Sequence, residues 1–304
     1  MNTTSPLWPA VLDHIRFDSP DPDALADFYR DGLGMAKIRI APDLYLMNGP
    51  QRRLLIGKGE KNGQPFAAFS LQSDTQLRAV REMLLANDVE LQPSPTPLFR
   101  DDALAVKDPD GRIAVFCLPA DNVASGSHEG LRAAKFSGRL QHVVVATTDL
   151  DRLGAFYEKK LGFTLSDTVC AGEETGPDAP AAVNFYRADV EHHSFAAFLA
   201  KTVRSDHHCY ETTCWNDIRD WADHLAEMGC TPWWGPGRHG VGRNLFFMAK
   251  DPDGNNFELS AELEHMPRIM PPRRWPNTQA TGNAWGKAWD RMKSTGADRT
   301  VEAE

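Results

Sequence analysis

Residues 12–35, LDHIRFDSPDPDALADFYRDGLGM, recur as residues 140–163, LQHVVVATTDLDRLGAFYEKKLGF. The two stretches keep one offset of 128 residues, which aligns His14 with His142 (142 − 14) and Gly34 with Gly162 (162 − 34). Each copy begins with alternating apolar residues typical of a strand. An aspartate-rich cap and a short amphipathic helix follow, and the helix ends near the glycine. Such an internal repeat predicts that the chain contains two copies of one module.

Two further pairs of stretches extend the repeat. Residues 67–87 match residues 208–228 as a strand followed by a helix, and KDPDGRIAVFCL (107–118) matches KDPDGNNFELSA (250–261). The DPDG motif is a turn signature between two strands. We therefore expect an α+β protein in which each module forms an antiparallel or mixed sheet that cups a cavity.

The repeat also sets the predicted boundaries along the chain. They are an N-terminal module at 8–120, a polar linker at 121–137, a C-terminal module at 138–262 and a Pro-rich C-terminal arm at 263–304. The offset grows along the second copy, which indicates insertions there. The last stretch of the arm, STGADRTVEAE, is predicted to be disordered.

Composition excludes several classes of function. The formal net charge of −9 argues against a nucleic-acid partner, and no apolar run approaches the ~20 residues that a membrane span needs. The N-terminal residues lack the features of a signal peptide. The five cysteines show no C-x-x-C spacing and are predicted to be reduced thiols of a cytoplasmic protein.

Three side chains in the second copy are predicted metal ligands. His142, His208 and Glu258 each lie in an expected strand, and three strands of one curved sheet can bring them together. Two imidazoles and one carboxylate leave the remaining coordination positions open. Non-haem Fe(II) uses this ligand set to bind substrate and dioxygen together, although ligand chemistry alone also permits Mn(II), Zn(II) or Ni(II). A Cys/His site that includes Cys209 is the weaker alternative.

The first copy provides an internal control for this prediction. His14 corresponds to His142, but Ala67 and Val115 stand at the positions of the other two ligands. The N-terminal module is therefore predicted to be metal-free.

Four motifs of the second copy carry a family resemblance. They occur in family order and spacing: HHSFAAF (192–198), SDHHCYE (205–211), GPGRHGVGRN (235–244) and KDPDGNNFEL (250–259). The chain resembles the vicinal oxygen chelate superfamily, and its two-module arrangement resembles type I extradiol ring-cleaving dioxygenases. The resemblance covers nearly all of the chain except the tail. It implies two tandem modules, each of paired βαβββ units that form a cupped mixed sheet.

The resemblance also refines the expected metal site. Fifty residues separate the second histidine of the doublet from the glutamate (258 − 208), and this family spacing favours His208 over His207. Strand alternation then turns His207 away from the site. Fe(II) is the implied metal, with Mn(II) second, and no organic cofactor is expected.

Two further histidines match catalytic positions of the family. His193 corresponds to its acid–base histidine, and a histidine whose pKa is near neutrality can remove a proton from a diol and return one later. His239, in a glycine-rich loop, corresponds to a residue that hydrogen-bonds the substrate oxygen. His192, beside the first of them, is expected to face the opposite way.

One position departs from the family pattern. A tyrosine often stands near the substrate hydroxyl where this chain has Met248, and a thioether cannot donate a hydrogen bond. A shifted substrate class, or a substitute such as Tyr186 or Tyr210, would account for the change. Trp233 and Trp234 are the preferred candidates for the wall of an aromatic pocket.

The resemblance implies an Fe(II)-dependent extradiol dioxygenase that cleaves an aromatic vicinal diol with dioxygen. Its expected partners are that diol and dioxygen, and the family habit and the Pro-rich arm indicate a homo-oligomer. One alternative is a dioxygenase of the same fold that acts on a hydroquinone or a 2-oxo acid. Another is a non-catalytic protein that binds an aromatic ligand. A glyoxalase-like isomerase would share its metal ligands between modules, which Ala67 and Val115 argue against.

Overall fold

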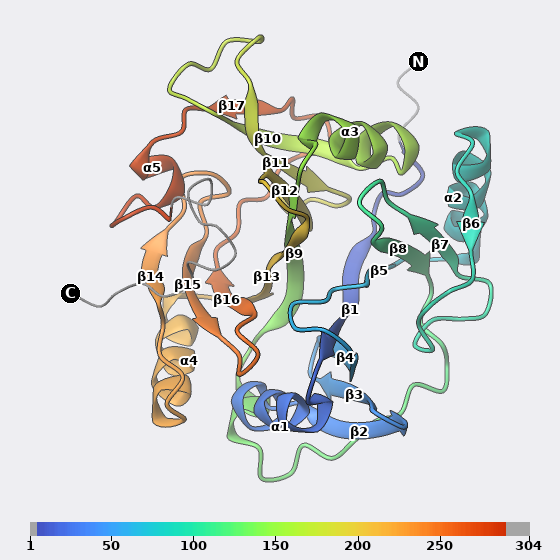
Figure 1. The fold of residues 1–304 in the computed structure, drawn as a ribbon, viewed down its shortest axis with the longest axis vertical. Coiled ribbons are helices and arrows are strands. Elements are labelled where there is room, and N and C mark those ends of the chain that lie inside the picture. The colour runs from blue at the N-terminus through green and yellow to red at the C-terminus, as the bar shows by residue number, and fades with distance from the viewer. Residues whose placement is uncertain (1–4, 290–304) are drawn as a thin grey trace.

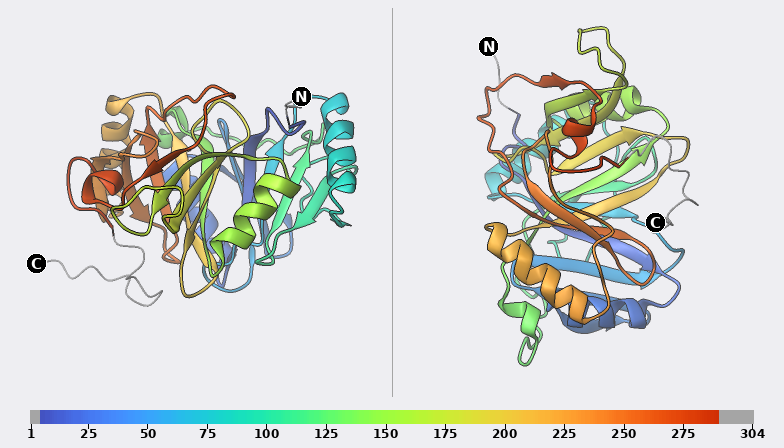
Figure 2. Two further views of the ribbon diagram at one scale, coloured as in Figure 1. Left: turned by 90° about the horizontal axis from the view of Figure 1, so that it is seen from above. Right: turned by 90° about the vertical axis from the view of Figure 1, so that its left-hand side faces the viewer.

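The structure, a computed structural model, describes residues 5–289 and contains two mixed β-sheets (Figure 1). The strand order is β2-β3-β4-β1-β5-β8-β7-β6 in the first sheet and β14-β15-β16-β13-β9-β12-β11-β10-β17 in the second. Helices lie at the periphery of the strands in both views of Figure 2. The predicted α+β class with two mixed sheets is confirmed.

The first sheet consists of two βαβββ units. Its elements are β1 (Val11–Ser19), α1 (Pro22–Leu33), β2 (Ala36–Ala41), β3 (Leu44–Gly49) and β4 (Arg52–Lys58), then β5 (Phe66–Ser70), α2 (Asp74–Ala86), β6 (Leu91–Gln92), β7 (Leu104–Lys107) and β8 (Ile113–Cys117). The first strands of the two units, β1 and β5, pair antiparallel at the centre of the sheet, and each pairs in parallel with the last strand of its own unit.

The second sheet repeats this plan. Its elements are β9 (Arg139–Thr147), α3 (Leu150–Ala155) with the π-helical turn η2 (Phe156–Lys160), β10 (Thr164–Cys170), β11 (Ala181–Arg187) and β12 (Phe195–Leu199), then β13 (Arg204–Glu211), α4 (Trp215–Glu227), β14 (Trp234–Arg238), β15 (Leu245–Lys250) and β16 (Asn256–Ala261). Here β9 and β13 form the central antiparallel pair, with β12 and β16 parallel to them.

The helix signals in the repeat act as the sequence indicates. Asp21 caps α1 by accepting the N–H of Ala24 at 3.2 Å, and Asp149 caps α3 by accepting the N–H of Arg152 at 2.9 Å. Gly34 ends α1 in the left-handed region with φ 63°, a conformation that glycine adopts without steric cost.

Contacts between the modules follow the internal symmetry. The strands β1 and β9 lie side by side at the junction (Figure 1). Tyr29 of the first module donates to Asp251 of the second at 3.1 Å, and Tyr157 of the second donates to Asp108 of the first at 3.3 Å. Buried Arg52 donates to the carbonyl groups of Ala133 and Phe136 in the linker, which contains the 3-10 turn η1 (Arg132–Lys135). These paired contacts fix the orientation of the second sheet relative to the first.

The described part of the C-terminal arm, residues 263–289, packs against the second sheet. Its strand β17 (Arg273–Trp275) pairs in parallel with β10, and the short helix α5 (Gln279–Gly282) follows. The stretch STGADRTVEAE, predicted to be disordered, lies outside the described residues. Across residues 5–289, no helix is long and apolar enough to cross a membrane.

Candidate metal centre and catalytic pocket

Three buried side chains of the second sheet converge on one point. Nε2 of His142, on β9, lies 3.2 Å from Nε2 of His207, on β13. Oε2 of Glu258, on β16, lies 3.2 Å from Nε2 of His207 and 3.7 Å from Nε2 of His142. Within residues 5–289, these three form the group of histidine, cysteine and acidic side chains whose geometry suits a metal ion.

The structure corrects one member of the predicted set, because His207 and not His208 faces this point. Cys209 is the residue of β13 in register with both His142 and Glu258, so these three share a face of the sheet. Two residues earlier, His207 lies on the same face, and His208 lies on the other. The prediction from the 50-residue spacing was therefore wrong about which face each histidine occupies.

His208 instead belongs to the junction with the first module. Its ring centroid lies 4.7 Å from that of Phe17, and its Nε2 lies 3.3 Å from the hydroxyl of Tyr29. Burial, helped by the nearby His207, lowers the pKa of His208 to about 3. A neutral imidazole packed between modules is a structural side chain.

A signal in the sequence separates the two neighbouring histidines of β13. Gln141 precedes His142 and accepts the hydrogen bond from its Nδ1. Asp206 precedes His207 and accepts from its Nδ1 at 2.8 Å. A polar acceptor directly before the histidine fixes the Nδ1–H tautomer, which directs the Nε2 lone pair into the site. This pattern, which is visible in the sequence, favours His207 over His208.

Glu258 is held as a carboxylate. Burial would raise the pKa of Glu258, but hydrogen bonds and charge interactions with His142 and His207 keep it below its ordinary value. Nδ2 of Asn244 donates to its Oε1 at 3.0 Å and fixes its orientation. Sequence reasoning missed Asn244. Two imidazole lone pairs and one ionised carboxylate on one side of a cavity fit a divalent metal with open positions.

A cavity of about 390 Å³ opens in front of these three side chains. His193 and His239 line it beside the candidate ligands. The remaining wall is largely apolar on the sheet side, with Val144, Val169, Ala182, Val183, Phe185, Phe198 and Val241. The arm covers it with Asn277, Thr278, Gln279, Thr281, Gly282, Ala288 and Trp289. Sequence reasoning did not expect the arm to form part of the pocket.

The two predicted catalytic histidines lie next to the candidate ligands. The ring centroid of His193 lies 4.2 Å from that of His142. Burial is the main cause that holds the pKa of His193 well below the ordinary value, and the neighbouring histidines lower it further. His239 stacks on Phe246 at 3.8 Å and donates Nδ1–H to the carbonyl of Gly282 at 2.6 Å. Its Nε2 lies 3.8 Å from Oε1 of Glu258.

None of the residues suggested in place of the family tyrosine reaches the cavity. Tyr186 packs against aromatic rings behind the sheet, and Tyr210 lies on the face of His208. Met248 is buried against Trp234. Among the described residues that line the cavity there is no tyrosine, and the tryptophan is Trp289 rather than Trp233 or Trp234.

The chain is similar in sequence and in fold to several known proteins. Metapyrocatechase 2 of Cupriavidus necator is 27% identical over 275 residues, which cover 84% of this chain and 82% of that protein. The iron-dependent extradiol dioxygenase of Rhodococcus jostii is 27% identical over 274 residues, with coverage of 83% and 88%. The Mn(II)-bound glyoxalase of Novosphingobium aromaticivorans has a TM-score of 0.73 at 19% identity and 91% coverage of both chains. Catechol dioxygenases are among the other solved structures with this fold.

The family itself follows from the length of chain that matches. The profile of the Glyoxalase/Bleomycin resistance protein/Dioxygenase superfamily covers residues 11–114 and 139–259, one stretch in each module. These stretches include β1 to β7, the start of β8 and the three converging side chains of the second sheet. The chain belongs to the Glyoxalase/Bleomycin resistance protein/Dioxygenase superfamily.

Proposed function

We propose that this protein is an Fe(II)-dependent extradiol dioxygenase, which inserts both atoms of dioxygen into a catecholic ring and opens the ring beside its two hydroxyl groups. The observation that carries the proposal is one cavity with two kinds of group. It holds the two-histidine, one-carboxylate set and, beside it, His193 and His239 in an otherwise largely apolar wall. The named sequence relatives that share most of the chain have the same chemistry in their names.

His142, His207 and Glu258 are the proposed metal ligands. The relatives point to a metal, and Fe(II) is the metal we favour because Zn(II) prefers closed tetrahedral sites and does not exchange electrons with oxygen. Mn(II) is second, because histidine and carboxylate ligands also suit it. The bound metal would supply Lewis acidity toward the diol and a path for electrons from the ring to dioxygen.

His193 and His239 are the proposed acid–base and substrate-binding residues. A neutral His193 imidazole accepts a proton from one diol hydroxyl and later returns it, so it works as a base and then as an acid. His239 gives its Nδ1–H to Gly282, which directs Nε2 into the cavity. That nitrogen accepts a hydrogen bond from a hydroxyl while neutral, and donates one to an ionised oxygen when protonated.

The wall of the cavity favours an uncharged ring. Among the described residues that line it, there is no lysine or arginine to pair with an anionic substituent. Val144, Val183 and Phe198 instead offer apolar surface to the ring. We therefore propose a catechol with apolar substituents as the substrate class.

Two alternatives use the same fold. A dioxygenase that acts on a hydroquinone or a 2-oxo acid remains the second candidate, because no described tyrosine reaches the cavity where many family members have one. A glyoxalase-like isomerase shares its ligands between modules, but His142, His207 and Glu258 all belong to the second sheet. A non-catalytic ligand-binding protein would have no use for the converging ligands.

Oxygen uptake after anaerobic Fe(II) loading tests the proposal. With uncharged alkyl- or aryl-substituted catechols, we expect one dioxygen consumed per substrate and a yellow ring-opened product. Carboxylated catechols should turn over more slowly, and Glu258→Ala should abolish uptake. Iron binding without uptake on any diol would favour the hydroquinone or 2-oxo acid alternative, and absence of iron binding would contradict the enzymatic proposal.

We further propose a cytoplasmic homo-oligomer. All five cysteines are free thiols, which suits a reducing compartment. On the arm, Ile269 is 94% exposed and Trp285 is 57% exposed, and these apolar side chains are candidates for a contact between subunits.

A further inference from the structure

A chain of three buried polar side chains begins at His193 and leads away from the cavity. Nδ1 of His193 lies 2.9 Å from Nδ1 of His192. On the other side of the second ring, Nε2 of His192 lies 2.9 Å from Oδ2 of Asp167. His192 and Asp167 are fully buried, and His193 is 4% exposed toward the cavity. His192 was expected to face the opposite way, but its side chain contacts the proposed base directly.

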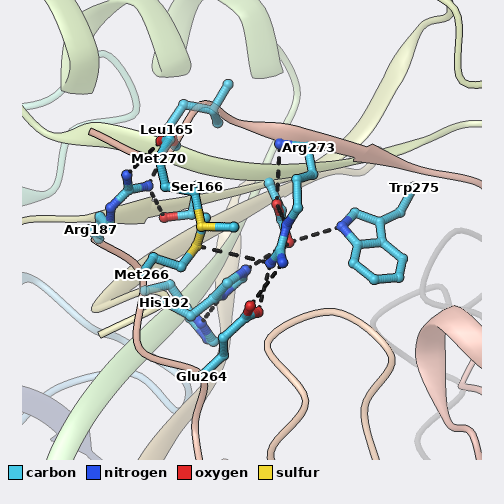
Figure 3. A network of polar contacts seen from close by, with 11 residues as sticks. Leu165, Ser166, Arg187, His192, Glu264, Met266, Met270, Arg273 and Trp275 are labelled. Atoms are coloured by element: carbon cyan, nitrogen blue, oxygen red, sulfur yellow. Dashed lines mark hydrogen bonds and ion pairs between the residues drawn. The ribbon is translucent and has the colours of Figure 1, made fainter. Parts of the chain in front are cut away.

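The C-terminal arm holds the carboxylate at the far end of this chain. Arg273 donates to Oδ1 of Asp167 from Nε and to Oδ2 from Nη2, both at 2.8 Å, and Trp275 donates from Nε1 to Oδ2 at 2.9 Å. Figure 3 shows Arg273 between Glu264 and Trp275, with the ring of His192 close by. Burial would raise the pKa of Asp167, but His192 and Arg273 keep it below its ordinary value. Asp167 is therefore an ionised acceptor.

The protons in this chain can be assigned from its acceptor end. An ionised carboxylate only accepts, so Nε2 of His192 must be the donor to Asp167. With Nε2 of His192 as that donor, its Nδ1 serves as the acceptor between the two rings and Nδ1 of His193 as the donor. The proton of neutral His193 is thus fixed on Nδ1. Its Nε2 is the ring nitrogen left to face the cavity as a proton acceptor.

We propose that Asp167 and His192 are positioning residues for His193, and that Arg273 and Trp275 of the C-terminal arm complete this unit. The inference rests on the proposed function and extends it to residues that do not touch the substrate. In this arrangement a diol hydroxyl gives its proton to Nε2 of His193, whose ring is already oriented and in the correct tautomer. The arm both covers the cavity and fixes the base beneath it.

Residues outside this unit also anchor the arm. Arg187 is fully buried and donates to the carbonyl of Met270 at 3.0 Å and to the hydroxyl of Ser166 at 2.9 Å (Figure 3). The side chain of His192 makes its hydrogen bonds to Asp167 and His193. A role for His192 in orienting the base is therefore separable from the attachment of the arm.

Four variants test the inference in the full-length protein. His192→Leu removes both hydrogen bonds, whereas His192→Asn keeps an acceptor near the position of Nδ1 and should restore part of the lost activity. Asp167→Asn presents an amide N–H to His192, which should move the proton of His192 to Nδ1 and that of His193 to Nε2. Glu264→Gln removes the other carboxylate partner of Arg273, and it is the matched control because it leaves the three-residue chain intact.

Two measurements are needed, and they respond differently. The ¹⁵N shifts of the ring of His193 in the metal-free protein should show a proton on Nδ1 in the unmodified protein and on Nε2 in Asp167→Asn. In the Fe(II)-loaded protein, His192→Leu should lower kcat by about 10²-fold or more, within the range for acid–base catalysis. Its metal content should be unchanged, and its KM should stay within about threefold, because ground-state binding is retained.

Several results would overturn the inference. They are a proton on Nε2 of His193 in the unmodified protein, turnover by His192→Leu close to that of the control, or no recovery in His192→Asn. If the unmodified protein turns over no diol at all, the proposed function fails. The ring-nitrogen shifts then still decide the positioning of His193.

Discussion

The two modules share one scaffold and differ in what fills its concavity. In both, the first strand presents a buried histidine whose Nδ1 is bonded to the preceding residue, Asp13 for His14 and Gln141 for His142. In the first module, however, Nε2 of His14 is 2.7 Å from the hydroxyl of Thr96. The nitrogen that faces the candidate metal site in one module is hydrogen-bonded to a loop residue in the other.

The register shows how the remaining ligand positions differ. His14 is in line with Ala68 on β5 and Val115 on β8, just as His142 is in line with Cys209 and Glu258. Phe66, two residues before Ala68, therefore takes the place of His207, and its ring lies 5.8 Å from that of His14. The first module thus has Thr96, Phe66 and Val115 around its histidine, where the second has an open position, His207 and Glu258. The strands and helices of the two modules are the same.

The largest expected effect comes from the same substitution in both modules. His142→Ala should reduce bound metal to background, because removal of a ligand exceeds the roughly 10–100-fold loss of affinity seen when an outer partner is removed. His14→Ala should leave metal content unchanged and lower the free energy of unfolding by about 1–3 kcal/mol, because Asp13 and Thr96 lose a buried partner. Elemental analysis and denaturant titration measure the two quantities. Equal loss of metal in both variants would contradict the prediction that His142, and not His14, is a metal ligand.

A smaller difference is expected between the two DPDG turns. Burial raises the pKa of Asp251 to about 6, and its neighbour in the turn is the neutral Asn255. Asp108 is buried in the same way, but Arg112 stands at the corresponding position with Nη1 3.9 Å from the carboxylate and opposes the rise in pKa. The carboxylate of Asp251 therefore has less stabilisation from a neighbouring positive charge than that of Asp108.

The sign of the resulting pH dependence follows from proton binding. An acid whose pKa is raised on folding binds more protons when folded, so the free energy of unfolding falls as pH rises from about 4 to 6. For Asp251 this loss is on the order of 2–3 kcal/mol. Asp251→Asn should remove this pH dependence. The difference in free energy of unfolding between the unmodified protein and the variant should therefore shrink by that amount between pH 4 and 7. Denaturant titrations at several pH values, with chelator present, measure this difference. Asp108→Asn is the control and should show a smaller effect. A difference in free energy of unfolding that does not change with pH would contradict the prediction.

Much of the fold and site could be predicted because the repeat lines up strands, caps and turns directly. His142 and Glu258 follow from strand position and from the loss of a matching acid at Val115. The choice between His207 and His208 depends on register. Residue spacing does not report which face of β13 is opposite His142, and the register of that pair shifts between Ser205 and His207. Pairing of Arg273 with Asp167 joins segments 106 residues apart, so local sequence gave no signal for the role of the arm.

Metal content of His207→Ala and His208→Ala, measured side by side after anaerobic Fe(II) loading, decides which of the two histidines is a metal ligand. The two residues are neighbours on one strand, so position in the chain and overall composition are matched. We expect background metal in His207→Ala. We expect about one ion per chain in His208→Ala, whose thermal stability should fall because its contacts with Phe17 and Tyr29 are lost. Retention of metal by His207→Ala together with its loss from His208→Ala would show that His208, and not His207, is the ligand.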